Sequence, residues 1–322
     1  MTNSKNDKIK AAVIGTGYLG RFHAQKYAAM DDVELVAVVD VDADRAQAVA
    51  DETGAARACT DLNEILSEIQ VASVVVPNIH HFDVARPLLE AGIHTLLEKP
   101  LTNTVAQADE LIALAAKNNV VLQSGHLERF NPAVRVLRER TGKPLFIEAH
   151  RLSGFKNRAT DVDVVLDLMI HDIDIVLSLV KSPLEEIRAS GLPVLTSNLD
   201  IANARLTFES GCTVNLTASR ISLKDMRKIR VFQEGTYISA DCATRENVIA
   251  TSTPVEGAEP RVVPEIMKHG ETDNLREELL SFIRAVRGEH PVEVTGQEGR
   301  DALAVAIEIN EAIAEQLSRK RT

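Results

Sequence analysis

The sequence predicts an α/β protein, with a doubly wound parallel sheet followed by an α+β domain that has a mainly antiparallel, open sheet. Strand-like and helix-like patterns alternate from Lys8 to about His126, as a doubly wound sheet requires. A glycine-rich turn joins the first strand to the first helix. Beyond Lys143, strand-like segments follow one another without helices between them, which indicates antiparallel pairing. For 322 residues we expect two domains, 1–126 and 127–322.

The elements of the first domain follow from apolar periodicity. Continuous apolar, β-capable runs predict buried strands, and apolar residues three and four apart predict helices. In chain order, the expected strands are 10–14, 33–39, 71–76, 95–97 and 120–123, and the expected helices are 18–30, 42–50, 62–68, 81–90 and 105–118.

The second domain is expected to start with a connecting helix that begins at Asn131-Pro132, where proline suits the first helical turn. A strand at 145–152 and a largely buried helix from 161 to 180 come next. Further strands are expected at 201–208, 213–219, 228–232 and 237–241, a loop or edge segment at 256–264, and closing helices at 274–287 and 299–316.

The glycine-rich turn has the form Gly15-x-Gly17-x-x-Gly20 and lies between a predicted strand and a predicted helix. In a dinucleotide-binding (Rossmann) turn, the three glycines permit the tight turn, the approach of a pyrophosphate and close helix packing, in that order. The helix N-terminus then offers free N–H groups to the phosphates. Tyr18 and Leu19 lie within this turn and are expected to contact the cofactor.

The strand at 33–39 ends in Asp40, at the spacing expected of the acid that binds the adenosine ribose. A carboxylate there can accept hydrogen bonds from both ribose hydroxyls but repels a 2′-phosphate. No arginine follows Asp40 directly, and Arg45 lies further on, in the next helix. The sequence therefore favours NAD over NADP.

The loop after the strand at 71–76 reaches the same sheet edge, so Pro77, Asn78 and His81 are expected to border the cofactor. Neighbouring residues point in different directions, so His80 and His81 would chelate a metal poorly. We assign His81 a structural or cofactor-bordering role and His80 none. The alternative is a helix start with two surface imidazoles.

Glu98-Lys99-Pro100 closes another short apolar strand. The carboxyl end of a parallel strand is where such sheets build their sites, and proline restricts the residue before it to extended geometry. Lys99 is therefore a candidate catalytic amine, with Glu98 and Lys99 also counted as cofactor contacts. The alternative is a lysine that begins a surface loop.

The buried helix from 161 to 180 carries polar residues. Residues three and four apart share a helix face, so Asp163, Asp167, His171 and Asp174 are expected to form one stripe, with Asp172 roughly opposite. The functional interpretation is an acid/base His171 beside the orienting carboxylate of Asp167. The alternative is a structural Asp–His pair.

In order and spacing, these motifs resemble the Gfo/Idh/MocA family of NAD(P)-dependent sugar oxidoreductases. The resemblance implies a Rossmann domain and a C-terminal domain whose open sheet covers the substrate and often makes a homodimer or homotetramer interface. It also implies that Lys99 and His171 are catalytic, with Asp167 beside them. Segments 125–132 and 163–174 look like the UDP-N-acetylglucosamine 3-dehydrogenase branch, whose keto-sugar product is aminated for lipid A.

The expected chemistry is hydride transfer from a sugar C–H to nicotinamide. Lys99 and His171 would converge on the hydroxyl from two domains, with His171 as the base. Arg129, Arg151 and Arg158 are candidate diphosphate ligands, because guanidinium groups suit phosphates, although each could be an ordinary surface arginine. The alternatives are an inositol, glucose or other polyol dehydrogenase, a redox-neutral glycosidase or lyase that uses NAD transiently, and a non-catalytic NAD-sensing regulator.

Composition limits the partners. The net charge of −11, from 36 Lys and Arg against 47 Asp and Glu, argues against nucleic acid and anionic membranes. The chain has no long apolar run, and its polar start does not resemble a signal peptide. Cys59, Cys212 and Cys242 are scattered and odd in number, which predicts reduced thiols in the cytoplasm and no structural zinc.

Overall fold

The structure, a computed structural model, describes residues 8–155, 162–256 and 258–319. The chain divides into two compact units. The first unit comprises Met1–Leu127 with Asp273–Arg300, and the second comprises Glu128–Thr272 with Asp301–Thr322. The sequence analysis placed all of 127–322 in one domain, whereas the structure returns the segment 273–300 to the first unit.

The first unit contains a six-stranded sheet in the order β3-β2-β1-β4-β5-β6, and every adjacent pair is parallel. This is the doubly wound order, with its topological switch point between β1 and β4. Its strands are β1 (Ile9–Ile14), β2 (Val33–Val39), β3 (Arg57–Cys59), β4 (Val71–Val74), β5 (His94–Glu98) and β6 (Leu122–Gly125). The sequence analysis did not predict β3, which has only three residues.

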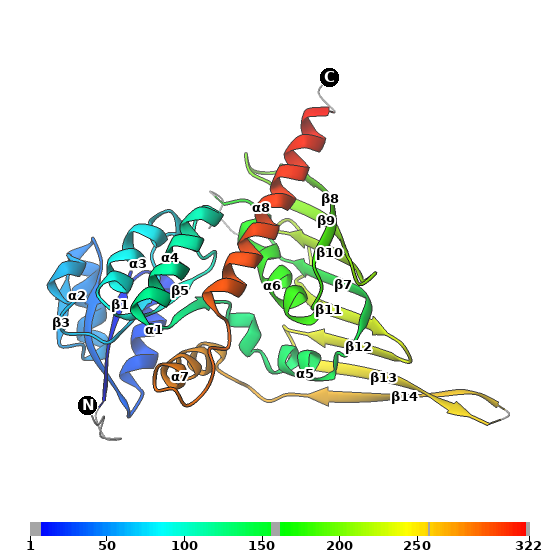
Figure 1. Cartoon of the computed structure of the whole chain (residues 1–322), viewed down its shortest axis with the longest axis horizontal. Coiled ribbons are helices and arrows are strands. Elements are labelled where there is room, and N and C mark those ends of the chain that lie inside the picture. The colour runs from blue at the N-terminus through cyan, green and yellow to red at the C-terminus, as the bar shows by residue number, and fades with distance from the viewer. Residues whose placement is uncertain (1–7, 156–161, 257, 320–322) are drawn as a thin grey trace. The chain divides into compact units, whose positions relative to one another are not determined.

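Helices connect these strands, as Figure 1 shows. They are α1 (Tyr18–Ala28), α2 (Ala43–Thr53), α3 (His81–Glu90) and α4 (Val105–Asn118), with short 3₁₀ turns η1 (Leu62–Glu64) and η2 (Asn78–His80). A third 3₁₀ turn, η3 (Leu127–Phe130), follows β6. Asp42 caps α2 by accepting the N–H of Arg45, and Gly54 ends that helix in the left-handed conformation. Where a helix was expected at 62–68, only the single turn η1 forms.

Helix α7 (Asn274–Val286) belongs to the first unit because its apolar face completes that core. Leu279 and Phe282 are fully buried and join a cluster that includes Val13 and Tyr27. Helix α7 also packs against α1. The periodicity of residues 274–287 predicted a helix correctly, but periodicity does not specify the surface on which the helix packs.

The second unit contains an eight-stranded sheet in the order β14-β13-β12-β11-β7-β10-β9-β8, which Figure 1 shows as one open layer. Only the β7–β10 pair is parallel. The strands are β7 (Pro144–Leu152), β8 (Leu184–Leu192), β9 (Ile201–Phe208), β10 (Thr213–Ser219), β11 (Met226–Gln233), β12 (Thr236–Asp241), β13 (Glu246–Val255) and β14 (Ala258–Lys268). The predicted mainly antiparallel sheet is confirmed, and the β7–β10 pair makes it mixed. Strands β8, β13 and most of β14 were not predicted.

Helices cover one face of this sheet, since α5 (Pro132–Arg140), α6 (Ile170–Leu179) and the later part of α8 (Gly296–Arg319) supply side chains to the same core. Along β9, residues alternate between buried and more exposed, with Ala202, Ala204 and Leu206 turned inward. The opposite face of β9 is more exposed and more polar.

The prediction of one buried helix from 161 to 180 is wrong at its N-terminal end. Residues Val165–Met169 form a π-helical segment, η4, and regular helix begins only with α6. The side chain of Asp163 accepts the N–H groups of Val165 and Leu166 at 2.8 and 3.0 Å. Asp163 thereby caps the start of this segment, because the first N–H groups of a helix have no partner within it.

Candidate active site

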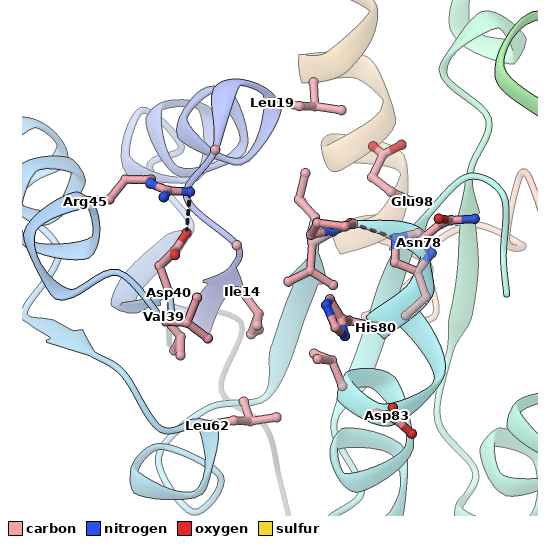
Figure 2. Close-up of a pocket in the computed structure, with 18 of the residues that line it drawn as sticks. Ile14, Leu19, Val39, Asp40, Arg45, Leu62, Asn78, His80, Asp83 and Glu98 are labelled. Carbon is pink, nitrogen blue, oxygen red and sulfur yellow. Dashed lines mark hydrogen bonds and ion pairs between the residues drawn. The ribbon is translucent and has the colours of Figure 1, made fainter. Parts of the chain in front are cut away.

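A cavity of about 720 Å³ lies in the first unit, at the carboxyl ends of β1, β2, β4 and β5. Figure 2 shows its lining side chains, including Asp40, Asn78 and Glu98. Most of the predicted cofactor residues line it: Gly15, Gly17, Leu19, Asp40, Pro77, Asn78, His81, Glu98 and Lys99. Two predicted residues are not in the lining. Tyr18 is 76% exposed and lies edge-on to Phe22, and Gly20 packs beneath the turn.

The glycine turn fits a pyrophosphate. Gly15 has φ of +91°, and a Cβ there would lie 2.5 Å from the carbonyl oxygen of Val75. A Cβ on Gly20 would lie 1.8 Å from the carbonyl oxygen of Gly15. Gly17 has open space where a side chain would be, and no side chain caps the helix it precedes. The first N–H groups of a helix have no acceptor within it, which suits the N-terminus of α1 to phosphate oxygens.

Asp40 ends β2 with its carboxylate fixed by neighbours. Its Oδ2 accepts the N–H and hydroxyl of Thr16 at 2.7 and 2.9 Å, and its Oδ1 accepts the N–H of Asp42 at 3.0 Å. Burial alone would raise the pKa of Asp40, but these hydrogen bonds and Arg45 outweigh it, so the pKa lies below its ordinary value. Asp40 therefore presents a permanent negative charge to the cavity.

His81 ties two cavity loops together. Its Nδ1 lies 2.8 Å from the carbonyl oxygen of Pro100, and its Nε2 lies 3.0 Å from that of Val76. Burial lowers the pKa of His81, so the ring is neutral near pH 7 and donates only one N–H at a time. His81 also lines the cavity, and its role beside a cofactor stays a prediction. His80, to which no role was assigned, also lines the cavity.

Lys99 directly follows β5, lines the cavity and is half-buried. The preceding Glu98 is buried, with its Oε1 3.3 Å from Nε2 of His23 on α1. Burial would raise the pKa of Glu98, but His23 and Lys99 favour the carboxylate, and its pKa is lowered. A negative charge is thus held beside Lys99.

Glu278 on α7 is a further buried carboxyl group in this unit, fully inaccessible to solvent. Neither carboxyl oxygen has a hydrogen-bond partner among the described residues. Burial, and then the charge of Glu98, raise its pKa well above the ordinary value. Glu278 is therefore a neutral acid in the folded protein. No sequence pattern separated it from the other glutamates of its helix.

The second unit holds the other two catalytic candidates. Asp167 lies in η4 and His171 in the first turn of α6, both half-buried. Nη2 of Arg220 lies 3.9 Å from Oδ2 of Asp167 and also donates to the carbonyl oxygen of Val162. Arg220, which the sequence analysis did not single out, follows directly after β10. π-Helical segments are frequent at functional sites.

Two of the three predicted diphosphate ligands occupy buried ion pairs instead. Arg129 is 1% exposed and donates from Nε and Nη2 to Asp174 at 2.7 and 2.9 Å. Arg151 donates to Asp172 from Nε and Nη2 and to Glu128 from Nη1. These contacts speak against a substrate role, and they place Asp174, which was expected in the polar stripe, in a buried ion pair. Arg158 lies outside the described residues.

Two kinds of feature are absent from the described part of the chain. No three His, Cys, Asp or Glu side chains gather there as a metal site would require. Within the same residues, no helix is long and apolar enough to cross a membrane.

The parallel sheet, the glycine turn and the charged cavity edge are those of a dinucleotide-binding Rossmann domain. Residues 9–126 match the family model described as "Oxidoreductase family, NAD-binding Rossmann fold", and residues 134–238 match the "GFO/IDH/MocA C-terminal domain". The chain belongs to the Gfo/Idh/MocA oxidoreductase family, as its motifs predicted.

Individual relatives agree with this assignment. A UDP-N-acetylglucosamine 3-dehydrogenase from Acidithiobacillus ferrooxidans is 37% identical over 97% of this chain and 99% of its own length. A solved structure of that enzyme has a TM-score of 0.89 and covers 95% of this chain and 98% of that chain. A myo-inositol 2-dehydrogenase from Thermotoga maritima is 26% identical over 97% of this chain and 98% of its own length. A levoglucosan dehydrogenase solved with NADH shares the fold, with 18% identity over 96% of this chain and 98% of that chain and a TM-score of 0.85.

Proposed function

We propose that this protein uses NAD to oxidise the 3-hydroxyl of UDP-N-acetylglucosamine to a ketone, ahead of amination for lipid A. The observation that carries the proposal is the 37% identity to a UDP-N-acetylglucosamine 3-dehydrogenase over 97% of the chain, which includes the second unit. The myo-inositol dehydrogenase covers the same share of the chain at only 26% identity. Oxidation of a free inositol is therefore the second candidate.

The proposed oxidation removes a hydride and a proton from the sugar. Bound NAD would supply the acceptor for the hydride of the C3–H bond. The O–H proton would leave to the protein as the C3–O bond becomes the carbonyl. We assign His171 as the general base, because neutral imidazole accepts a proton near neutral pH. Asp167 orients that imidazole. Lys99 donates a hydrogen bond to the oxygen as negative charge develops on it.

Two features of the first unit support the role of Lys99. The side chain stands at the edge of the cavity that fits the dinucleotide, and the carboxylate of Glu98 precedes it. An ammonium beside a fixed carboxylate keeps its charge and remains a hydrogen-bond donor. Pro77, Asn78, His81 and Glu98 are proposed to border the nicotinamide end, with Asp40 at the adenosine ribose.

Location and assembly are further parts of the proposal. We place the protein in the cytoplasm and expect a homodimer or homotetramer formed through the more exposed face of the second unit's sheet. An aromatic cluster there supports this: Phe232 is 38% exposed, and its ring centroid lies 5.6 Å from that of Phe146 and 5.1 Å from that of Tyr237. Light scattering of Phe232→Ser against the unaltered protein tests the assembly, since a change to monomer is expected.

The test of activity is NADH formation with UDP-N-acetylglucosamine, UDP-glucose, free N-acetylglucosamine and myo-inositol. We expect the first substrate to give the highest kcat/KM. Substrate deuterated at C3 should transfer deuterium to the reduced cofactor, and substrate deuterated at C4 should not. The Lys99→Met protein is the matched control for contaminating dehydrogenases. Turnover of myo-inositol alone would favour the second candidate, and NAD binding without any turnover would favour a regulator.

A further inference from the structure

Arg45 stands at the edge of the cofactor cavity, beside the acid that selects NAD. It lies in the first turn of α2 and lines the cavity. Its Nη2 donates to Oδ2 of Asp42 at 2.9 Å, and its Nη1 lies 3.7 Å from Oδ2 of Asp40. Figure 2 shows the guanidinium group turned toward Asp40, with a dashed line between them. The sequence placed Arg45 merely somewhere in the next helix.

The two carboxylates around Arg45 differ in burial. Asp40 is 8% exposed and is held by three hydrogen bonds, so its charge cannot move away. The side chains of Asp42 and Arg45 are 44% and 49% exposed. A surface ion pair of this kind is weak, and a guanidinium on a long side chain can exchange partners.

We propose that Arg45 is a latent ligand for a 2′-phosphate on the adenosine ribose, and that Asp40 and Asp42 together keep it from serving as one. A guanidinium group binds a phosphate through paired, charge-assisted hydrogen bonds. The carboxylate of Asp40 repels the phosphate and attracts the guanidinium group of Arg45. The carboxylate of Asp42 pairs with the same guanidinium group and so competes with the phosphate for it. Selectivity for NAD is then a property of three residues, not of Asp40 alone.

The proposal predicts a specific pattern among variants. Asp40→Ser removes the repulsion, but Asp42 still holds Arg45, so NADP binding should improve only partly. Asp42→Ser removes the second charge and keeps a residue type that caps helices well, so α2 should remain intact. In the double variant, NADP should bind about three- to fivefold more tightly than in Asp40→Ser alone, the scale of one exposed ion pair that no longer competes for Arg45.

Calorimetry provides a readout that does not depend on activity or on the sugar substrate. Each variant is titrated with NAD and NADP, and with 5′-AMP and adenosine 2′,5′-bisphosphate as fragments that differ only by the phosphate. Adding Arg45→Met to the double variant is the matched control, and it should abolish the additional gain. The gain should also shrink as salt rises, because the new contact is ionic.

Two results would overturn the proposal. One is a double variant that binds NADP and the bisphosphate no better than Asp40→Ser does. The other is a gain that persists after Arg45→Met, since another residue would then hold the phosphate. Failure of the proposed sugar oxidation would leave these titrations unaffected, because they require only the NAD-binding domain of the family.

Discussion

Nε2 of His23 lies 3.3 Å from Oε1 of Glu98, inside the first unit, and the His23 side chain is fully buried. Glu98 is the residue before Lys99, so this contact joins helix α1 to the cavity edge. Glu278 adds a second buried carboxyl group to the same electrostatic environment, since the charge of Glu98 helps to raise its pKa. Two buried acids thus exist in opposite states, with Glu98 ionised and Glu278 neutral.

The neutral state of Glu278 predicts a pH dependence of stability. Its folded pKa lies well above the unfolded value, so between these two values the folded state binds the extra proton. The free energy of unfolding should therefore fall as pH rises above the unfolded pKa of about 4.3. Glu278→Gln keeps the shape of the neutral acid and removes the titration.

Urea unfolding of both proteins from about pH 5 to about pH 9 measures this difference. The stability of Glu278→Gln relative to the unaltered protein should increase steadily with pH. Parallel curves across the range would contradict the prediction, because they would show that Glu278 is ionised in the folded state. Glu277→Gln, on the same helix but less buried, is the matched control.

Lys99→Met should lower kcat by about 10²- to 10⁴-fold, the range for loss of one group that assists proton transfer or charge development. The methionine side chain retains much of the length but cannot donate a hydrogen bond. NAD affinity measured by calorimetry should change little by comparison. Near-normal turnover would remove Lys99 from the catalytic assignment, and loss of NAD binding would make it a cofactor residue only.

The Arg129–Asp174 pair should contribute to stability, not to substrate affinity. Both side chains are about 1% exposed, so removing one partner leaves an uncompensated buried charge. Asp174→Asn should lower the free energy of unfolding by about 3–5 kcal/mol. The double variant Arg129→Met/Asp174→Leu should lose less than Asp174→Asn does, because neither charge remains. An unchanged urea midpoint for Asp174→Asn would contradict this role.

Short sequence patterns predicted many of the residues that line the cavity of the first unit. The glycine turn, Asp40 and Lys99 each stand at the end of a buried strand, and the parallel order of those strands brings them to one sheet edge. Each of these positions could be read from a short stretch of sequence. The order of the strands could be predicted because right-handed connections leave few arrangements of an alternating strand–helix pattern.

Contacts between distant residues could not be read in this way. Arg129 pairs with a residue 45 positions away, and Arg151 with one 21 positions away. A guanidinium group looks the same in sequence whether it faces a substrate or a buried carboxylate. Strand β8 was not predicted because its residues are largely exposed or half-buried, which leaves little apolar alternation to detect.

His171 provides the most direct test of the proposed chemistry. If its neutral imidazole accepts the hydroxyl proton, kcat/KM should rise with pH through the pKa of His171 and then level off. His171→Ala should slow the reaction and remove this acidic limb. Asp167→Asn should slow it less, because it disturbs the orientation of the imidazole without removing the proton acceptor. Arg220, 3.9 Å from Asp167, offers a control: Arg220→Met perturbs the same carboxylate and should leave the acidic limb in place. A His171→Ala protein that retains the limb would identify another group as the base, with Lys99 the next candidate.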